Sequence, residues 1–382
     1  MPLWLLSIIK ILAIVFGFVM ALASLLTLLG DRKQSAKIQN RVGPNQAKLF
    51  GTSFLQDIGI PHFIADGIKL ILKENTVPTG SNRFLFTIAP ALVFMPTLLG
   101  WAAIPFMDHY CTGQIQLMPG YQEVCQGGEW RNYFGIMEMN GGLLYAFAIT
   151  AISVYGAAIA GWASNNKFSL LGGLRSSAQM ISYEVTMGLS LAGLLLIFGT
   201  LNFNTMAQQQ GQQLFGFLPM WGIVVQPVAF FLFFLAAMAE TKRAPFDLPE
   251  GESEIVAGYL TEYSSMKFAV MQLGEYVATV FIGALVALLF FGGWQVPFLY
   301  GDGFHFGAPT GVADISVPYF IVIVLRILSM ITKIIFFVWL QFMMRWTLPR
   351  FRYDQVMVLG WKILLPLSLA NLLVTALLVL MF

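Results

Sequence analysis

Long apolar stretches constrain this chain more than any other feature of its sequence. A helix needs about 20 mostly apolar residues to cross a hydrocarbon core of roughly 30 Å, and the sequence contains about eight such stretches. Only 10% of the residues are charged, against roughly 25% in a soluble domain. The chain is therefore predicted to be an all-α, polytopic integral membrane protein. The expected spans lie near residues 3–29, 84–106, 134–162, 182–201, 219–239, 275–293, 318–344 and 360–381.

Basic residues gather in alternate loops. These loops hold 17 of the 21 basic residues, whereas the loops between them hold only Arg131. The positive-inside rule puts the basic loops on the cytoplasmic side and, with eight spans, both termini outside. No cleavage site follows the first span, which we expect to remain as a helix. The basic loops are 30–83, 163–178, 240–274 and 345–362.

The chain is predicted to be a single membrane domain, 1–382, because no part of it has the composition of a soluble domain. The first inner loop is basic and amphipathic, and the third is acidic. The expected segments are the first span (1–30), the basic inner loop (31–83), spans two to five (84–239), the acidic inner loop (240–274) and spans six to eight (275–382).

Composition also limits the cofactors and partners of this chain. Its two cysteines and three histidines form no ligand cluster for an iron-sulfur centre, a haem or a structural zinc. We therefore expect no cofactor or metal on this chain, and any electron carrier on another one. A net charge of +2 leaves no basic surplus for nucleic acid.

The outer loops 107–133, 202–218 and 295–317 have the composition of solvated connectors, and we assign them no chemistry. Cys111 and Cys125 share the first of them, on the oxidising side of a bacterial inner membrane. A disulfide and two separate thiols both remain open.

The first inner loop contains a predicted turn that redirects the chain. Gly43 and Pro44 form a turn directly after Arg41. Beyond the turn, short amphipathic stretches broken at Gly59 and Pro61 can lie along the membrane interface. A plain basic anchor for lipid headgroups fits the same composition.

The acidic inner loop has the wrong sign for such an anchor. It holds six carboxylates between residues 240 and 262 and only three basic residues before Phe268. Carboxylates that are close together and partly desolvated have raised pKa values, as a proton relay requires. A solvated acidic loop is the alternative. The relay candidates within the loop are Glu250, Glu252 and Glu254.

Carboxylates at span depth are the second anomaly. An ionisable side chain at bilayer depth costs at least ~2.5 to 3.5 kcal/mol, so it is a functional candidate by default. Arg326 and Lys333 of the seventh span lie near one helical face and are candidate counter-charges. The span-depth relay candidates are Glu184, Glu240 and Glu275, with Glu138 in the first turn of its span as a weaker one.

These motifs together resemble one family, the quinone-site membrane subunit of respiratory complex I, the proton-pumping NADH:quinone oxidoreductase. The match runs from Asp31 to the last span. Asp31 stands where the family usually has Glu, Glu138 where it usually has Asp, and the outer loops look longer than usual. The matching motifs are Arg32-Lys33, Gln39 to Asn45, Asp66 to Lys69, Lys73-Glu74, Gly161 to Lys167, Arg175, Ala178-Gln179, Ser182 to Val185, Ala239 to Glu254, Glu262-Tyr263, Gly274 to Tyr276, Leu348 to Gln355 and Trp361-Lys362.

The resemblance implies a mechanism. Peripheral-arm subunits carrying flavin and iron-sulfur clusters would dock on the inner loops and pass electrons from NADH to a quinone. This chain would form the membrane side of the quinone chamber with Arg41, Arg243, Phe246 and Asp247. The relay carboxylates would pass the charge change to antiporter-like and small membrane subunits. The chain would not be catalytic alone.

Three other functions remain open on the sequence. The nearest is the matching subunit of an energy-converting hydrogenase or formate hydrogenlyase. A stand-alone ion antiporter would also carry carboxylates at span depth. A docking scaffold would use its charges only to bind a peripheral arm.

Overall fold

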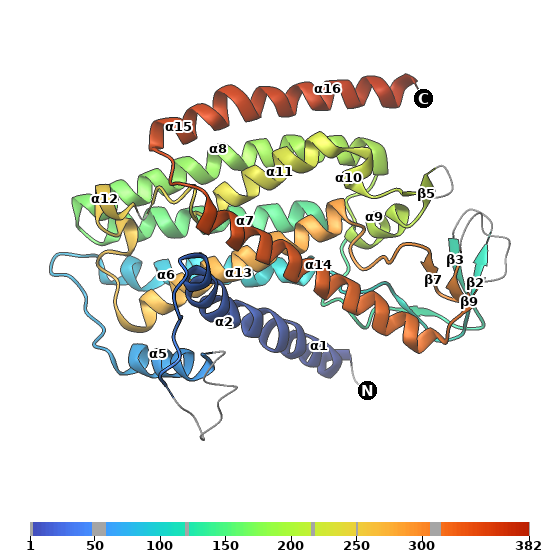
Figure 1. The fold of residues 1–382 in the computed structure, drawn as a ribbon, viewed down its shortest axis with the longest axis horizontal. Coiled ribbons are helices and arrows are strands. Elements are labelled where there is room, and N and C mark those ends of the chain that lie inside the picture. The colour runs from blue at the N-terminus through green and yellow to red at the C-terminus, as the bar shows by residue number, and fades with distance from the viewer. Residues whose placement is uncertain are drawn as a thin grey trace.

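Helices dominate the computed structural model, which describes residues 3–47, 59–118, 122–214, 218–249, 251–305 and 315–381 (Figure 1). Seven of the described helices are long and apolar enough to cross a membrane. Neighbouring helices pack lengthwise against one another along the long axis of the molecule. This arrangement confirms the predicted all-α, polytopic membrane fold.

The first candidate span is a nearly continuous rod of α and π helix. It comprises α1 (Leu3–Ile11), η1 (Leu12–Met20), α2 (Ala21–Leu28), η2 (Leu29–Gln34) and α3 (Ser35–Ile38). The other candidate spans are α6 (Arg83–Gly100) with the short η3 (Trp101–Ala103), α7 (Gly142–Ala163), α8 (Lys167–Phe198), α13 (Ser265–Phe290), α14 (Tyr319–Thr347), and the rod of α15 (Tyr353–Val358), η5 (Leu359–Leu364) and α16 (Leu365–Met381).

The predicted fifth span is shorter than the others. It consists of α11 (Pro227–Glu240), 14 residues long, preceded by the single turn α10 (Gly222–Val225). The break falls at Gln226, because Pro227 has no N–H to donate to the turn before it. Gln226 instead donates to the hydroxyl of Thr375 at 2.6 Å and accepts from Asn371 at 3.0 Å, so α16 stabilises the break.

Three helices begin at other residues than the predicted boundaries, and a side-chain cap explains the first case. α8 begins at Lys167, so most of the expected inner loop 163–178 is helix; Asn166 caps it by accepting from the N–H of Phe168 at 3.0 Å. α13 begins at Ser265 rather than at 275. α7 begins at Gly142 rather than at 134, so Glu138 precedes the helix and is not in its first turn.

Small residues allow the spans to pack closely. Gly161 of α7 and Gly173 of α8 face each other, and a Cβ on Gly161 would lie 2.5 Å from the carbonyl oxygen of Ser169. Such small-residue contacts are how helices associate in lipid, where burial of apolar surface gives little advantage. α13 lies at the centre of the bundle, and every residue from Gly274 to Phe290 except Ala278 is buried.

Short helices and strands close the two ends of the bundle. α5 (Ile60–Leu72), α12 (Glu252–Ile255) and η4 (Gly258–Leu260) lie at one end. The other end carries α9 (Phe203–Gln210) and several small antiparallel sheets. Three of these sheets have two strands each: β1 (Tyr110–Cys111) with β4 (Trp130–Arg131), β2 (Gln114–Met118) with β3 (Gln122–Gln126), and β5 (Gln213–Leu214) with β6 (Leu218–Pro219). The fourth contains β7 (Leu299–Tyr300), β8 (Gly303–Phe304) and β9 (Ile315–Ser316).

The strand-bearing end is formed by the three expected outer loops, and both chain termini point toward it (Figure 1). Lys10 of α1 binds the carbonyl oxygens of Asn132 and Gly135 there. Cys111 and Cys125 form a disulfide, which resolves the open choice between a disulfide and two thiols. These loops are therefore an assembled cap, and the expectation of plain connectors was wrong.

Candidate functional site

Arg243 lies at the other end of the bundle, in the loop that follows α11. It is 7% exposed, and its guanidinium carbon is 3.8 Å from the ring centre of Tyr276 and 5.5 Å from that of Phe342. Its NH1 atom is 4.0 Å from the carboxylate of Asp31. Two aromatic ring faces and a carboxylate thus surround this cation and hold it in place.

Asp31 is shared by several partners. It belongs to the π-helical η2, accepts a hydrogen bond from the hydroxyl of Tyr276, and pairs with Arg345 of α14 at 2.6 Å. Gly30 allows α14 to approach, since a Cβ there would lie 2.7 Å from the Phe342 ring. We call Asp31, Arg243, Tyr276 and Arg345 the Asp31 cluster.

Phe246 and Asp247 lie beside this cluster. Phe246 is 2% exposed and packs between Tyr183 and Phe351, with ring centres 5.8 and 5.6 Å away. Gln179 of α8 fixes the loop by donating to the carbonyl oxygens of Phe246, at 2.8 Å, and of Ala239, at 2.6 Å. The predicted chamber residues Arg243, Phe246 and Asp247 are therefore brought together.

Asp247 occupies a cleft of about 490 Å³ that Arg345 and Arg350 also line. Its carboxylate accepts a hydrogen bond from Arg350 at 2.9 Å. Burial raises the pKa of Asp247 to about 6, and the charge of Arg350 opposes that shift. Asp247 can therefore change its protonation state near neutral pH.

Arg41 lies apart from the other predicted chamber residues. It is exposed and donates to the side chain of Gln39 at 2.7 Å. It lines a separate cleft of about 490 Å³, together with Asp31, Arg32 and His62. Asp31 is the residue that connects this cleft with Arg243.

Two of the predicted relay carboxylates line one small cavity. Glu240 of α11 and Glu275 of α13 border about 40 Å³ of space between α6, α7, α8, α11 and α13. Four residues with hydroxyl side chains, Thr97, Thr150, Ser153 and Thr241, line it as well. The rest of the lining is mostly apolar, and a space of this size has room for on the order of two or three water molecules beside these polar groups. We call it the relay cavity.

The surroundings of the relay cavity extend the polar path in two directions. Glu184 of α8 lies close enough to Glu240 for their charges to interact. Glu275 accepts a hydrogen bond from the hydroxyl of Tyr259 at 2.7 Å, and Lys242 lies 5.0 Å from the ring centre of Tyr259. No ion pair involves Glu184, Glu240 or Glu275 within the part of the chain that the structure describes.

The other acidic candidates lie elsewhere. Glu254 pairs with Arg175 of α8 at 2.6 Å, so it has its own counter-ion rather than a carboxylate neighbour. Glu138 lies at the strand-bearing end, 2.9 Å from His109, and the structure does not bring it to the relay cavity. Glu252 lies in α12, and its side chain falls outside the described residues, as does Glu250.

The prediction that Arg326 and Lys333 are counter-charges for the relay carboxylates was wrong. Arg326 pairs with Glu123 of the cap, and Lys333 donates to the carbonyl oxygens of Phe291, Gly293 and Gln295 at 2.6 to 2.8 Å. Neither cation serves a relay carboxylate. Arg326 lies near the cap and Lys333 lies at the C-terminal end of α13, whereas the relay carboxylates lie toward the other end of the bundle.

Several residues of the site were missed as site residues. Asp31, Tyr276, Arg345 and Arg350 all belong to motifs that carried the family resemblance or border them, so their signal was present in the sequence. Tyr259 was missed because an isolated tyrosine in an acidic loop carries no spacing that would pair it with Glu275. Among the described residues, no group of three His, Cys, Asp or Glu side chains is arranged to hold a metal ion.

Comparisons with known proteins agree with this geometry. The family model described as NADH dehydrogenase matches residues 9–376. The chain belongs to the NADH dehydrogenase family. The resemblance drawn from the motifs is thereby confirmed, and the chain is an integral membrane protein.

Relatives match almost the full chain. It is 40% identical to an NADH-quinone oxidoreductase H-subunit of Cytophaga hutchinsonii over 352 residues, which cover 92% of this chain and 91% of the relative. It is 41% identical to the NADH-quinone oxidoreductase H-subunit of Paramagnetospirillum magneticum, covering 97% and 92%. A third relative, an H-subunit of the same enzyme from Syntrophobacter fumaroxidans, is 42% identical, covering 95% and 93%. None of these names supports the hydrogenase or antiporter alternative.

Proposed function

We propose that this chain is the quinone-site membrane subunit of an NADH-quinone oxidoreductase, and that it couples quinone reduction to proton translocation. The Asp31 cluster, Phe246 and Asp247 form the membrane side of the quinone chamber. Glu184, Glu240 and Glu275 form the proton relay. Flavin, iron-sulfur clusters and the residues that bind the quinone head are on peripheral-arm subunits docked at this end of the bundle.

One observation carries the coupling. Two pairs of adjacent residues each have one member on the relay cavity and one in the Asp31 cluster. Glu275 lines the cavity while Tyr276 donates to Asp31. Lys242 lines the cavity while Arg243 lies beside Asp31. A charge change at the cluster therefore acts on the relay carboxylates across a single residue.

The chemistry follows from these contacts. Quinone reduction takes up two electrons and two protons, so negative charge develops in the chamber before the protons arrive. Arg243 and Arg345, which share Asp31 as a counter-ion at rest, are drawn toward that charge, because charge-assisted contacts are strong where water is scarce. The hydrogen bond from Tyr276 to Asp31 changes with them, and the change reaches the relay cavity through the neighbouring residue Glu275.

The topology belongs to the same proposal. The Asp31 cluster and α12 face the cytoplasm of a bacterial cell, and both termini face outside. The proposal is supported by the 17 basic residues in alternate loops and by the grouping of those loops at one end of the bundle. An impermeant thiol reagent added from outside should not label a cysteine placed at Asn45. Labelling from outside would overturn this orientation.

The test of the chamber is Arg243→Lys in the intact complex. Lysine keeps the charge but loses the planar group that lies against Tyr276. We expect NADH:quinone activity to fall about tenfold, while NADH oxidation by an artificial acceptor upstream of the quinone is unchanged. Arg352→Lys is the matched control, because Arg352 is exposed and pairs only with Asp354 among the described residues. Equal loss of both activities in Arg243→Lys, or no loss, would contradict the chamber assignment.

A further inference from the structure

Arg326 is a buried cation in the wrong half of the molecule for the proposed chemistry. It lies in α14, is 1% exposed, and its guanidinium carbon is 4.9 Å from the ring centre of Trp294. Its two terminal nitrogen atoms, NH1 and NH2, both donate to the carboxylate of Glu123, which comes from β3 of the cap. A buried arginine is costly, so its retention at this depth calls for a role.

Glu123 is itself held firmly. One of its oxygens also accepts from the N–H of Gly301 at 3.0 Å. The turn at Gly301 packs directly on β2, since a Cβ there would lie 2.6 Å from Ile115. The hairpin that carries Glu123 is therefore docked on the β7–β8–β9 sheet, which leads into α14.

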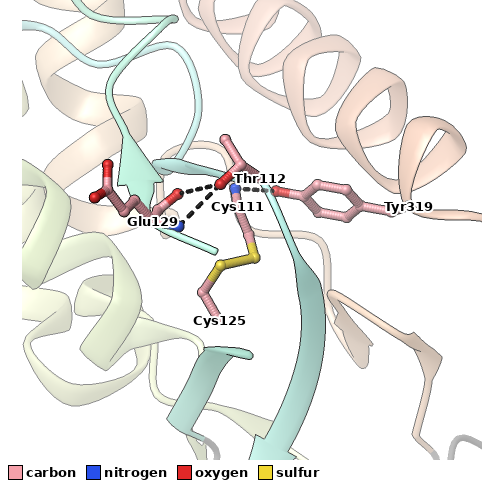
Figure 2. The surroundings of a disulfide bond; sticks show 5 residues. All are labelled: Cys111, Thr112, Cys125, Glu129 and Tyr319. Atoms are coloured by element: carbon pink, nitrogen blue, oxygen red, sulfur yellow. Dashed lines mark hydrogen bonds between the residues drawn. A yellow bond between two sulfur atoms is a disulfide. The ribbon is translucent and has the colours of Figure 1, made fainter. Parts of the chain in front are cut away.

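A disulfide ties the same hairpin to the start of α14. Cys125 in β3 is bonded to Cys111 in β1, and the N–H of Cys111 donates to the hydroxyl of Tyr319 at 3.2 Å (Figure 2). Tyr319 and Arg326 are seven residues apart, so they lie on one face of the helix. The cap thus contacts this face of α14 at two residues, Tyr319 and Arg326.

Lys333, a further seven residues along, fixes α14 to α13. Its ammonium group donates to three carbonyl oxygens around the C-terminal end of α13, where a positive charge is favoured. Tyr319, Arg326 and Lys333 therefore determine how far α14 extends along the bundle and how it is rotated.

The other end of α14 reaches the Asp31 cluster. Arg345 pairs with Asp31 at 2.6 Å, and the indole N–H of Trp346 donates to the carbonyl oxygen of Gly30 at 3.3 Å. α14 has 29 residues with no glycine or proline, so it lacks the usual causes of a kink. A shift imposed at the cap is consequently carried to Arg345.

We propose that Arg326 and its cap partner Glu123 are positioning residues for the quinone chamber, because their ion pair sets the register of α14 and so places Arg345 on Asp31. The proposal rests on the proposed function of the Asp31 cluster. It assigns the long outer loop a task on the opposite side of the membrane.

The test uses the intact complex with both charges removed together, Glu123→Gln with Arg326→Gln. Removing both avoids leaving one charge buried alone, so the complex should still assemble. At equal amounts of complex, we expect the KM for a short-chain quinone to rise at least threefold, with NADH oxidation by an artificial acceptor unchanged. A role confined to stabilising the cap would lower the amount of complex and leave this KM unmoved.

A second variant tests the proposal if the double-Gln complex does not assemble. Cys111→Ser with Cys125→Ser keeps the ion pair but frees the hairpin, and it should raise the same KM by a smaller factor. Glu129→Gln is the control, because Glu129 is exposed and pairs only with its neighbour Arg131 within the described chain. Unchanged KM in the cysteine variant and in any assembled double-Gln variant overturns the positioning role. If Arg243→Lys still lowers quinone turnover, the proposed function stands without it.

Discussion

Buried charged groups have different kinds of partners at the two ends of the bundle. At the cap, each cation within a span has its own partners: Glu123 for Arg326, and main-chain carbonyl oxygens for Lys10 and Lys333. At the other end, one carboxylate, Asp31, is approached by two arginines and a tyrosine. Glu240 and Glu275 line a shared cavity.

This difference separates charges that hold the fold from charges that can respond. A cation with its own set of acceptors is satisfied in one state and gains nothing by changing it. A carboxylate shared among several partners can lose one of them and keep the others, so its contacts can change when the charge nearby changes.

The first prediction concerns the loss of Arg326 from its ion pair with Glu123. Arg326→Met leaves Glu123, whose side chain is 12% exposed, without its counter-ion. Breaking a buried pair from one side costs ~3 to 5 kcal/mol, so the amount of assembled complex should fall severely. Immunoblots or native gels of membranes measure this amount. Normal abundance would mean that the cap does not depend on the pair.

The second prediction concerns the shared carboxylate. Asp31→Asn keeps the size of the side chain but removes the charge that faces Arg243 and Arg345. We expect a smaller loss of assembled complex than in Arg326→Met, because the rings of Tyr276 and Phe342 still face Arg243. At equal amounts of complex we expect a loss of about tenfold in NADH:quinone activity, with artificial-acceptor activity unchanged. Asp354→Asn is the control, because Asp354 is exposed. A collapse of assembly in Asp31→Asn would place Asp31 with the structural charges instead.

The third prediction addresses the relay. Glu to Gln at 184, 240 or 275 keeps size and hydrogen bonding but removes titration. Since none of these residues has an ion-pair partner among the described residues, the complex should assemble. At least one variant should then lose several-fold in quinone turnover or in its linked proton uptake, and Glu to Asp should retain more. Glu262→Gln, beside Asn166, is the control. Normal pumping in all three variants would remove the relay from this chain.

The helical spans and the grouping of the basic loops at one end were predictable because their signals are local. Apolar length gave the helical bundle, and the charge of alternate loops gave two distinct ends. The resemblance assigned Arg243 and Asp247 to one site, and because they lie four positions apart in one loop the structure brings them close together. Helix boundaries were less predictable: the polar residues of 167–178 suggested a loop, whereas the Asn166 cap and close glycine packing extend α8 through them.

The cap was not predictable for a different reason. The contact between Glu123 and Arg326 joins residues 203 positions apart, and nothing in either local sequence indicates the other. A single arginine in a span predicts a carboxylate partner, and the nearest candidates by depth were the relay glutamates. Only the folded hairpin shows that the partner comes from an outer loop.

The last prediction tests whether titration at the cap affects stability rather than turnover. His109 lies 3.2 Å from Asp108 and 2.9 Å from Glu138. The hydrogen bond with Asp108, assisted by Glu138, raises the pKa of His109 from 6.5 to about 9. A histidine whose pKa is raised in the folded state contributes stability that is fully present below pH 6.5 and is lost as the pH rises through 9.

We therefore expect the Tm of the purified complex to fall by a few degrees between pH 6.5 and 9, and to fall less in His109→Asn. The change should be small, because Glu138 is half exposed and water screens its charge. Quinone turnover at neutral pH should be the same in both proteins, since His109 lies at the opposite end from the Asp31 cluster. A turnover defect in His109→Asn at normal abundance would show that the cap's charges also respond during catalysis, and the division between the two ends would fail.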